Sequence, residues 1–260
     1  MDWRDRYTLL MSSLPAHERW GSRHQTPLSR LKLERRLRLL SQPDADLLAR
    51  IESLLQWREL PITSDNQQLV LRQRKLLETL RHDDTRPRAE ATALLALIQQ
   101  RLDVRTLVAA LWRREYQQDN DPPPSGLWSV SRYRQTIEQY WHEPTFRLEV
   151  AQPWLPQALT CIRSHQPWEL EQMLLQHNWI LTGRYLLPGD NSLVAVVAYV
   201  LKWDMLDRRI GYDATQAQAR FSDWVAVDIA AVTAVEPGPL DPKASSNFTQ
   251  SSTMASGAPL

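Results

Sequence analysis

The chain has 260 residues, enough for one large domain or two smaller ones, and its hydrophobic content of 43% is ordinary for a soluble globular protein. A formal net charge of +1 and a sequence pI near 7.9 argue against a nucleic-acid-binding domain, which is normally distinctly more basic. Only 7 glycines are present, so glycine-rich phosphate loops are scarce and helices are favoured over sheets.

Four helix starts in the first half of the chain are marked by a capping residue or by a proline of the first turn: Thr26-Pro27, Asp44, Asp65 and Pro87. Apolar residues recur at helical spacing after each start, and the longest of these helices runs to about Tyr116. The earlier segment YTLLMSSLP (7–15) is compatible with either a strand or a helix.

Three consecutive prolines in QQDNDPPPSG (117–126) end the helical pattern and mark an internal boundary. Helical patterns then return at five places: 129–142, 154–165, 168–182, 190–209 and 213–234. After Glu236 the chain is rich in Pro, Ser, Gly and Thr, which predicts a disordered tail. The expected organisation is therefore an N-terminal helical half at 1–120, a proline-rich linker at 121–128, a C-terminal helical half at 129–235 and a tail at 236–260.

These patterns predict an all-α, multi-helix bundle. The segment 190–209 is apolar nearly all round in its first half, so we expect it in the middle of the bundle, with a buried strand as the alternative. QRLDVRTL (100–107) and LKWDMLDR (201–208) share a basic, an apolar and an Asp position at one offset. That echo leaves open an architecture of repeated helical units.

The cellular location follows from the cysteine count and from the apolar runs. Cys161 is the single cysteine, lies on an apolar face and is expected to be a buried, inert thiol in a reducing compartment. The first residues lack the layout of a signal peptide. LVAVVAYVL (193–201) is shorter than the roughly 18–20 residues that span a bilayer. We expect a cytoplasmic protein without direct membrane insertion.

The search for catalytic and cofactor motifs is negative. No GxxxxGK, GxGxxG, GxSxG or HExxH pattern occurs, and the six histidines are scattered with no spacing typical of a metal site. His142 and Glu143 could form an acid–base couple, but an ion pair at a helix end is the expected arrangement. The sequence therefore predicts a non-enzyme without catalytic, metal or cofactor-binding residues.

Arginine clusters raise the question of the partner. Residues 1–120 carry 21 Lys and Arg against 16 Asp and Glu, a surplus that suits phosphates, anionic lipid, an acidic protein or a solvated exterior. Acidic residues adjoin the clusters, and the 11 tryptophans are spread singly along the chain as expected for helix packing. We therefore expect no nucleic-acid partner.

The stretch LDVRTLVAALWRREY (102–116) combines apolar residues at helical spacing with several arginines. Val104, Leu107 and Leu111 form an apolar stripe that we expect in the core. The arginines of this helix lie off the stripe and are expected to be solvated or to meet a protein: Arg101, Arg105 and Arg113. Asp103 is expected to form an ion pair locally.

Together with YTLLMSSLP near the start and VVAYVLKWDMLDRR followed by FSDWV near the end, this stretch resembles a divergent bacterial family. The family is encoded with V/A-type rotary ATPases and is related to their C subunit, called d in eukaryotes. The resemblance spans most of residues 5–235 as spaced apolar, Asp and Arg positions. This chain is shorter than the typical C subunit, so one repeated helical unit is expected to be reduced or missing.

The resemblance implies a non-catalytic, all-helical central-stalk subunit that couples the central shaft to the membrane rotor ring. It would lie in the cytoplasm at the inner face of the membrane, held there by other ATPase subunits. Partner contacts are expected at five arginines: Arg35, Arg36, Arg38, Arg113 and Arg114. The alternative is a stand-alone helical adaptor or regulator that binds another protein.

Overall fold

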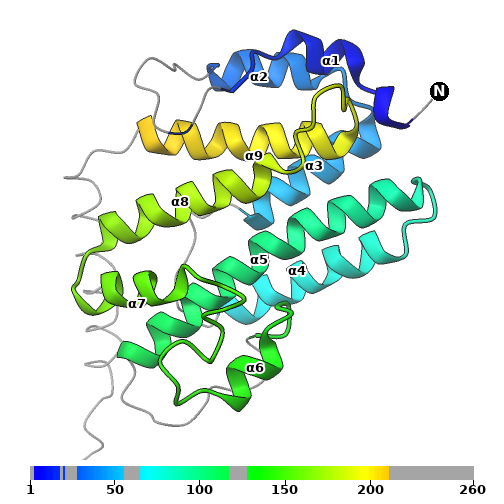
Figure 1. Ribbon diagram of the computed structural model, residues 1–260. Coiled ribbons are helices and arrows are strands. Elements are labelled where there is room, and N and C mark those ends of the chain that lie inside the picture. Colours follow the sequence, from blue (N-terminus) through cyan, green and yellow to red (C-terminus); the bar gives the residue numbers. More distant parts are fainter. Residues whose placement is uncertain (1–2, 18–19, 21–27, 56–64, 117–127, 211–260) are drawn as a thin grey trace, which may run out of the picture. The chain divides into compact units, whose positions relative to one another are not determined.

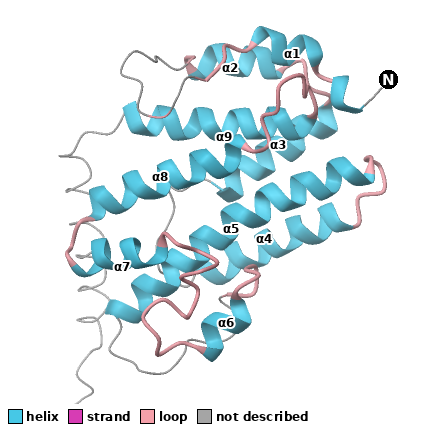
Figure 2. Ribbon diagram, in the orientation of Figure 1, coloured by secondary structure: helices cyan, strands magenta, loops and turns pink. Residues whose placement is uncertain are grey.

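The computed structural model describes residues 3–17, 20, 28–55, 65–116 and 128–210, and these residues form helices and loops without a strand (Figures 1 and 2). After a single 3₁₀ turn at Trp3–Asp5, the α-helices of this described part are α1 (Thr8–Ser13), α2 (Arg30–Leu37), α3 (Gln42–Leu55), α4 (Asp65–Arg81), α5 (Arg88–Tyr116), α6 (Arg134–Gln139), α7 (Leu155–Arg163), α8 (Pro167–Gly183) and α9 (Leu193–Ile210). The predicted all-α class is confirmed.

The first half agrees with the sequence expectations apart from one capping residue. The segment 7–15 contains the helix α1, and α4 and α5 begin where Asp65 and Pro87 predict. The Thr26-Pro27 cap lies outside the described residues. Asp44 does not cap α3, which begins two residues earlier at Gln42. Instead, the side chain of Asp44 is 1% exposed and is held in a buried ionic network.

In the second half, α7, α8 and α9 lie within a few residues of the predicted ranges, but the helix expected at 129–142 is reduced to α6. The residues before α6 form turns because Asp103 accepts hydrogen bonds from the Ser131 hydroxyl and the Arg132 backbone N–H, which fixes a non-helical path. The predicted helix at 213–234 and the tail at 236–260 lie outside the described residues.

The interior consists of two hydrophobic clusters of different composition. The first is largely aliphatic and takes residues from α1 to α5, α8 and α9. The second is rich in aromatic side chains and is built from the end of α5 with α6, α7, α8 and the intervening loops; its buried rings are Trp128, Trp141, Phe146 and Trp154. Two helices, α5 and α8, supply residues to both clusters.

The helix α9 occupies the predicted interior position. Its residues from Leu193 to Leu201 are at most 4% exposed, and the helix packs against α3, α5 and α8. The buried-strand alternative is therefore wrong. Its first turn is capped twice, because Glu90 accepts the backbone N–H of Leu193 and the Ser192 hydroxyl oxygen accepts that of Ala195.

Helices from both sides of the proline-rich segment pack together, since α7, α8 and α9 all contact α5. All described residues belong to one compact unit, Met1–Ala217, and the second unit, Gln218–Leu260, lies outside them. The division at 121–128 stays a prediction. Among the described helices, none combines the length and the apolar composition that crossing a bilayer requires.

Candidate functional site

The outward face of α2 carries the first predicted arginine set. Arg35 and Arg38 are exposed and have no hydrogen-bond or ion-pair partner among the described residues, and the same is true of Lys32. At 100° per residue, Arg35 and Arg38 share one face with Leu31 and Leu39, which are 61% and 49% exposed. We call these five residues the α2 stripe: Leu31, Lys32, Arg35, Arg38 and Leu39.

The opposite face of α2 explains why this stripe points outward. Leu33 is fully buried in the first cluster, and Leu40 beyond the helix end is also buried there. The one acidic residue of α2, Glu34, pairs with Arg30 at 2.8 Å, and Arg30 also reaches Glu52 of α3. Arg36 is half-buried, and its Nη1 is buried without a hydrogen-bond partner among the described residues. The stripe therefore carries a positive charge with which no acidic residue in the described part of the chain is paired.

The second predicted set, at the end of α5, is engaged within the chain. Arg114 donates through Nη1 to the backbone oxygen of Glu143, and its guanidinium lies 5.3 Å from the centre of the Phe146 ring. It also pairs with Glu115, which accepts a second hydrogen bond from Arg163 of α7 at 2.8 Å. Arg113 is half-buried and likewise interacts with other residues. Arg114 thus fastens the loop after α6 to α5.

That loop has an unusual backbone. Phe146 and Arg147 both have positive φ, +56° and +57°, a conformation that costs energy for residues other than glycine. The fully buried Phe146 ring, stacked at 5.8 Å on Trp141, holds the turn in place. The predicted His142–Glu143 ion pair is wrong, because Glu143 pairs with Arg147 at 2.7 Å.

The two arginine sets are not brought together. The α2 stripe lies on a helix of the first cluster, whereas Arg113 and Arg114 lie beside the second cluster. Figure 1 accordingly shows α2 and the last turns of α5 well separated. The five predicted partner-binding residues therefore do not form a single surface, and of the two sets the α2 stripe has the uncommitted cations.

The middle of α5 departs from the sequence expectation. Arg101 and Arg105 are 8% and 9% exposed, so the prediction that they are solvated or meet a protein is wrong. Arg105 donates to the backbone oxygen of Leu54 at 3.2 Å. Asp103 does form an ion pair, with Arg132 at 2.7 Å, but the partner lies 29 residues away. The helix is buried all round here because Arg105 faces Leu54 at the end of α3 and Arg101 faces α8 and α9, which cover the flank beside the apolar stripe.

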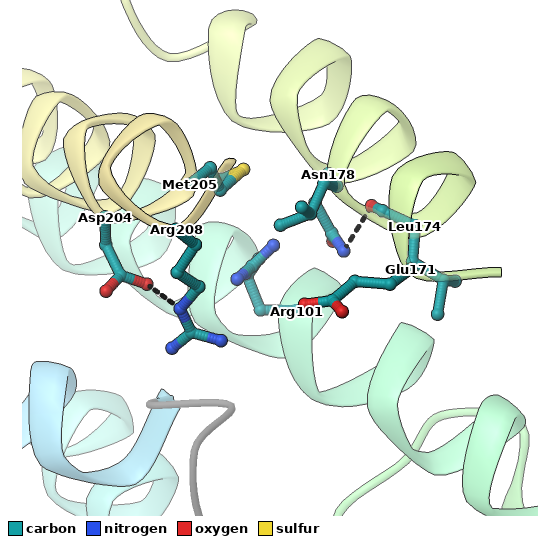
Figure 3. A pocket seen from close by; sticks show the side chains of 8 residues that line it. Arg101, Glu171, Leu174, Asn178, Asp204, Met205 and Arg208 are labelled. Atoms are coloured by element: carbon teal, nitrogen blue, oxygen red, sulfur yellow. Dashed lines mark hydrogen bonds and ion pairs between the residues drawn. The ribbon is translucent and has the colours of Figure 1, made fainter. Parts of the chain in front are cut away.

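Arg101 lines a small hollow between α5, α8 and α9, seen in Figure 3. The polar lining comes from all three helices: Arg101 of α5, Glu171 and Asn178 of α8, and Asp204 and Arg208 of α9. Asp204 and Arg208 pair at 3.2 Å, and the Asn178 amide donates to the backbone oxygen of Leu174 at 2.8 Å. The enclosed space is about the size of one water molecule.

The electrostatics of this hollow are set mainly by the burial of Arg101. Burial lowers the pKa of Arg101 to about 10, since Asp204 offsets only part of the lost hydration and the charges of Arg208 and Arg105 lower it further. That value is still well above neutrality, so Arg101 stays charged inside the protein. Its Nη1 atom, like the Nη2 atom of Arg208, is buried without a hydrogen-bond partner among the described residues.

A second buried ionic site lies where α1, α3 and the α4–α5 loop meet. The carboxylate of Asp44 accepts hydrogen bonds from the hydroxyls of Tyr7 and Ser41 and pairs with Arg86. Burial alone would raise the pKa of Asp44, but the Tyr7 hydroxyl and the Arg86 guanidinium outweigh it and hold the pKa below its usual value. Nearby, burial raises the pKa of Glu90.

The single cysteine lies in an environment that disfavours its reactive thiolate form. Cys161 is 6% exposed, as predicted, and burial raises the pKa of its thiol, so little reactive thiolate is present. Among the described residues, no three His, Cys, Asp or Glu side chains are placed to hold a metal ion.

Sequence reasoning missed one exposed basic group on α4. Arg72, Arg74 and Lys75 are exposed and have no ion-pair partner in the described part of the chain. Their signal was present as the run LRQRK (71–75), whose three cations have no acidic residue among them.

The comparisons with known proteins add no relative. The chain matches no protein-family model, no curated protein and no solved structure.

Proposed function

We propose that the chain is a non-catalytic helical subunit that binds partner proteins through the α2 stripe. On the sequence resemblance, we assign it to the central stalk of a V/A-type rotary ATPase, where it would work as the C-like (eukaryotic d-like) subunit between the central shaft and the membrane rotor ring. In that role it is cytoplasmic and peripheral at the inner face of the membrane. The observation that carries protein binding is the positive charge of the α2 stripe, with which no acidic residue in the described part of the chain is paired.

The chemistry of the α2 stripe favours an acidic partner surface. Three cations point away from the core without a counter-ion in the described chain: Lys32, Arg35 and Arg38. A carboxylate of a partner could therefore pair with them without breaking an ion pair inside the chain. Leu31 and Leu39 flank these cations and offer apolar area that a partner can bury. Such charges also speed the first encounter between two proteins.

The filled interior supports a mechanical role. A subunit that transmits torque needs stiffness, and α5 extends over 29 residues, about 43 Å at the helical rise of ~1.5 Å per residue. Its two hydrophobic clusters and the Arg114–Glu115–Arg163 contacts fasten it to α7, α8 and the loop after α6. These features support a stiff body and are also compatible with other helical scaffolds.

The alternative is a stand-alone helical adaptor or regulator. The exposed cations and leucines of the α2 stripe favour it as well, because an acidic partner surface can bind them from outside without an ATPase assembly.

The two functions separate in an affinity purification of the tagged full chain from its organism of origin, after gentle membrane solubilisation. We expect V/A-type ATPase subunits to co-purify with the natural chain and to be lost with the triple variant K32E/R35E/R38E. The matched control R72E/R74E/K75E makes the same charge change on exposed residues of α4 and should retain them.

Each other outcome has a definite meaning. Recovery of intact ATPase without the tagged chain contradicts the central-stalk assignment. One different partner that is lost only with the α2 variant establishes the adaptor instead. Equal recovery of partners with both triple variants contradicts the assignment of the interface to α2.

A further inference from the structure

The buried guanidinium of Arg101 has no ion-pair partner among the described residues. Its Nη1 atom is buried and makes no hydrogen bond within the described part of the chain, and the residue as a whole is 8% exposed. A buried charge without a partner is strongly unfavourable, and native proteins almost always satisfy such a group with a side chain, a water or an ion. Arg101 therefore requires a ligand that the neighbouring side chains do not supply.

The carboxylates around the hollow do not meet this need. Asp204 is paired with Arg208 at 3.2 Å, and it acts on Arg101 only from a longer distance. Glu171 lines the same hollow and has an interaction of its own. On α5, Arg105 adds a further positive charge that acts on Arg101. Two arginines and two carboxylates line the hollow, but Asp204 is paired with Arg208, so no ion pair to Arg101 is left among the described residues.

Two residues of the lining carry buried donors without hydrogen-bond partners among the described residues. Arg101 extends from α5 toward Asn178 of α8, whereas the guanidinium of Arg208 on α9 is directed to the other side, beside Asp204 (Figure 3). Arg208 also has a buried Nη2 without a hydrogen-bond partner among the described residues. Two guanidinium groups with unused N–H donors provide the chemistry that binds anions.

We infer that this hollow binds one small monovalent anion, of which chloride is the representative in cells, against Arg101 and Arg208. The hollow is small, about the volume of one water molecule, so a monatomic anion is the smallest charged occupant that would meet Arg101 there. The side-chain oxygen of Asn178, also buried without a partner, faces the same space and would favour a water as the competing occupant. This site is independent of the proposed function.

Bound there, the anion would link α5, α8 and α9, each of which supplies a polar side chain to the lining. It would neutralise the buried charge of Arg101. Because ligand binding to the folded state alone stabilises that state, the stability of the chain should depend on halide concentration.

The test is thermal unfolding of the full chain in bromide or chloride against gluconate and sulfate at equal ionic strength. We expect halides to raise the midpoint by a few degrees relative to gluconate, whereas the general stabilisation by sulfate should be equal in the natural chain and in Arg101→Met. Arg101→Met should remove the halide effect, and Arg208→Gln should weaken halide binding by about tenfold or more. The control Arg35→Gln, which removes an exposed charge of the same type, should respond as the natural chain does.

Line broadening of the chloride NMR signal gives a second readout that needs no unfolding. Excess broadening with the natural chain and with Arg35→Gln, absent with either hollow variant, supports the site. Equal broadening for all four proteins, or a halide effect on the midpoint that persists in Arg101→Met, overturns it. Bromide-soaked crystals that show only a water in the hollow would overturn it as well.

Discussion

Asp44 and Arg101 are both buried charged residues, but they differ in how many hydrogen-bond and ion-pair partners surround them. Asp44 is 1% exposed and is surrounded by donors, with Tyr7, Ser41 and Arg86 all directed at its carboxylate. Arg101 is 8% exposed and has no ion pair within the described residues. Depth of burial is similar, so the supply of partners decides whether a buried charge holds helices together or weakens their packing.

The largest effect is expected from Asp44→Ala. This change leaves Arg86, whose side chain is 7% exposed, with only Asp83 as an ionic partner. We expect the free energy of unfolding to fall by about 3 kcal/mol, measured by denaturant titration. Asp46→Ala, at an exposed position of the same helix, should change it by no more than about 0.5 kcal/mol. Similar losses for the two variants would contradict the distinction drawn for Asp44.

Arg101→Met should change the free energy of unfolding in the opposite direction, toward greater stability. In a buffer free of halide it replaces an unpaired buried cation by an apolar side chain of similar length, so we expect stabilisation by about 2 kcal/mol. The difference from the natural chain should shrink as chloride is added. A clear loss of stability in the halide-free buffer would mean that Arg101 has a favourable partner, and the comparison with Asp44 would fail.

The smallest effect is a difference in pH dependence between two carboxylates. The pKa of Asp44 is lowered in the folded chain, so its stabilisation is present above the unfolded pKa and is lost as pH falls through the folded pKa. The pKa of Glu90 is raised by burial, so its contribution is complete below the unfolded pKa and declines as pH rises through the folded pKa.

Glu90→Gln isolates the second of these terms, because the amide oxygen can still accept the backbone N–H of Leu193. Relative to the natural chain, this variant should gain stability as pH rises through the folded pKa of Glu90, because the amide does not have to become charged inside the protein. Denaturant titrations at a series of pH values measure the gain. If the free energy of unfolding of Glu90→Gln differs from that of the natural chain by the same amount at all pH values, Glu90 does not titrate in this range.

The fold was largely predictable because most helices have local causes. Helical spacing together with Pro87 defines α5, and the apolar run at 193–201 places α9 inside. The reduction of α6 was not predictable, because the turn before it depends on Asp103, which lies 28 residues from Ser131. A side chain that intercepts backbone donors from a distant segment leaves no periodic signal in that segment.

The candidate sites were only partly predictable. Leu33 and Leu40 fix the orientation of α2, so the exposure of Arg35 and Arg38 follows from local spacing. Arg101 gave no such signal, since its position off the apolar stripe reads as exposed until α8 and α9 cover that face. The hollow arises from three helices, and no single segment encodes it.

The sharing of α5 and α8 between the two hydrophobic clusters has a consequence for cooperativity. Leu102 belongs to the aliphatic cluster and Val104 to the aromatic one, so a single helical turn forms part of both interiors. Losing that turn would expose apolar surface in both at once, and neither interior can melt while the other stays intact. The folded part of the chain should therefore unfold in one all-or-none step.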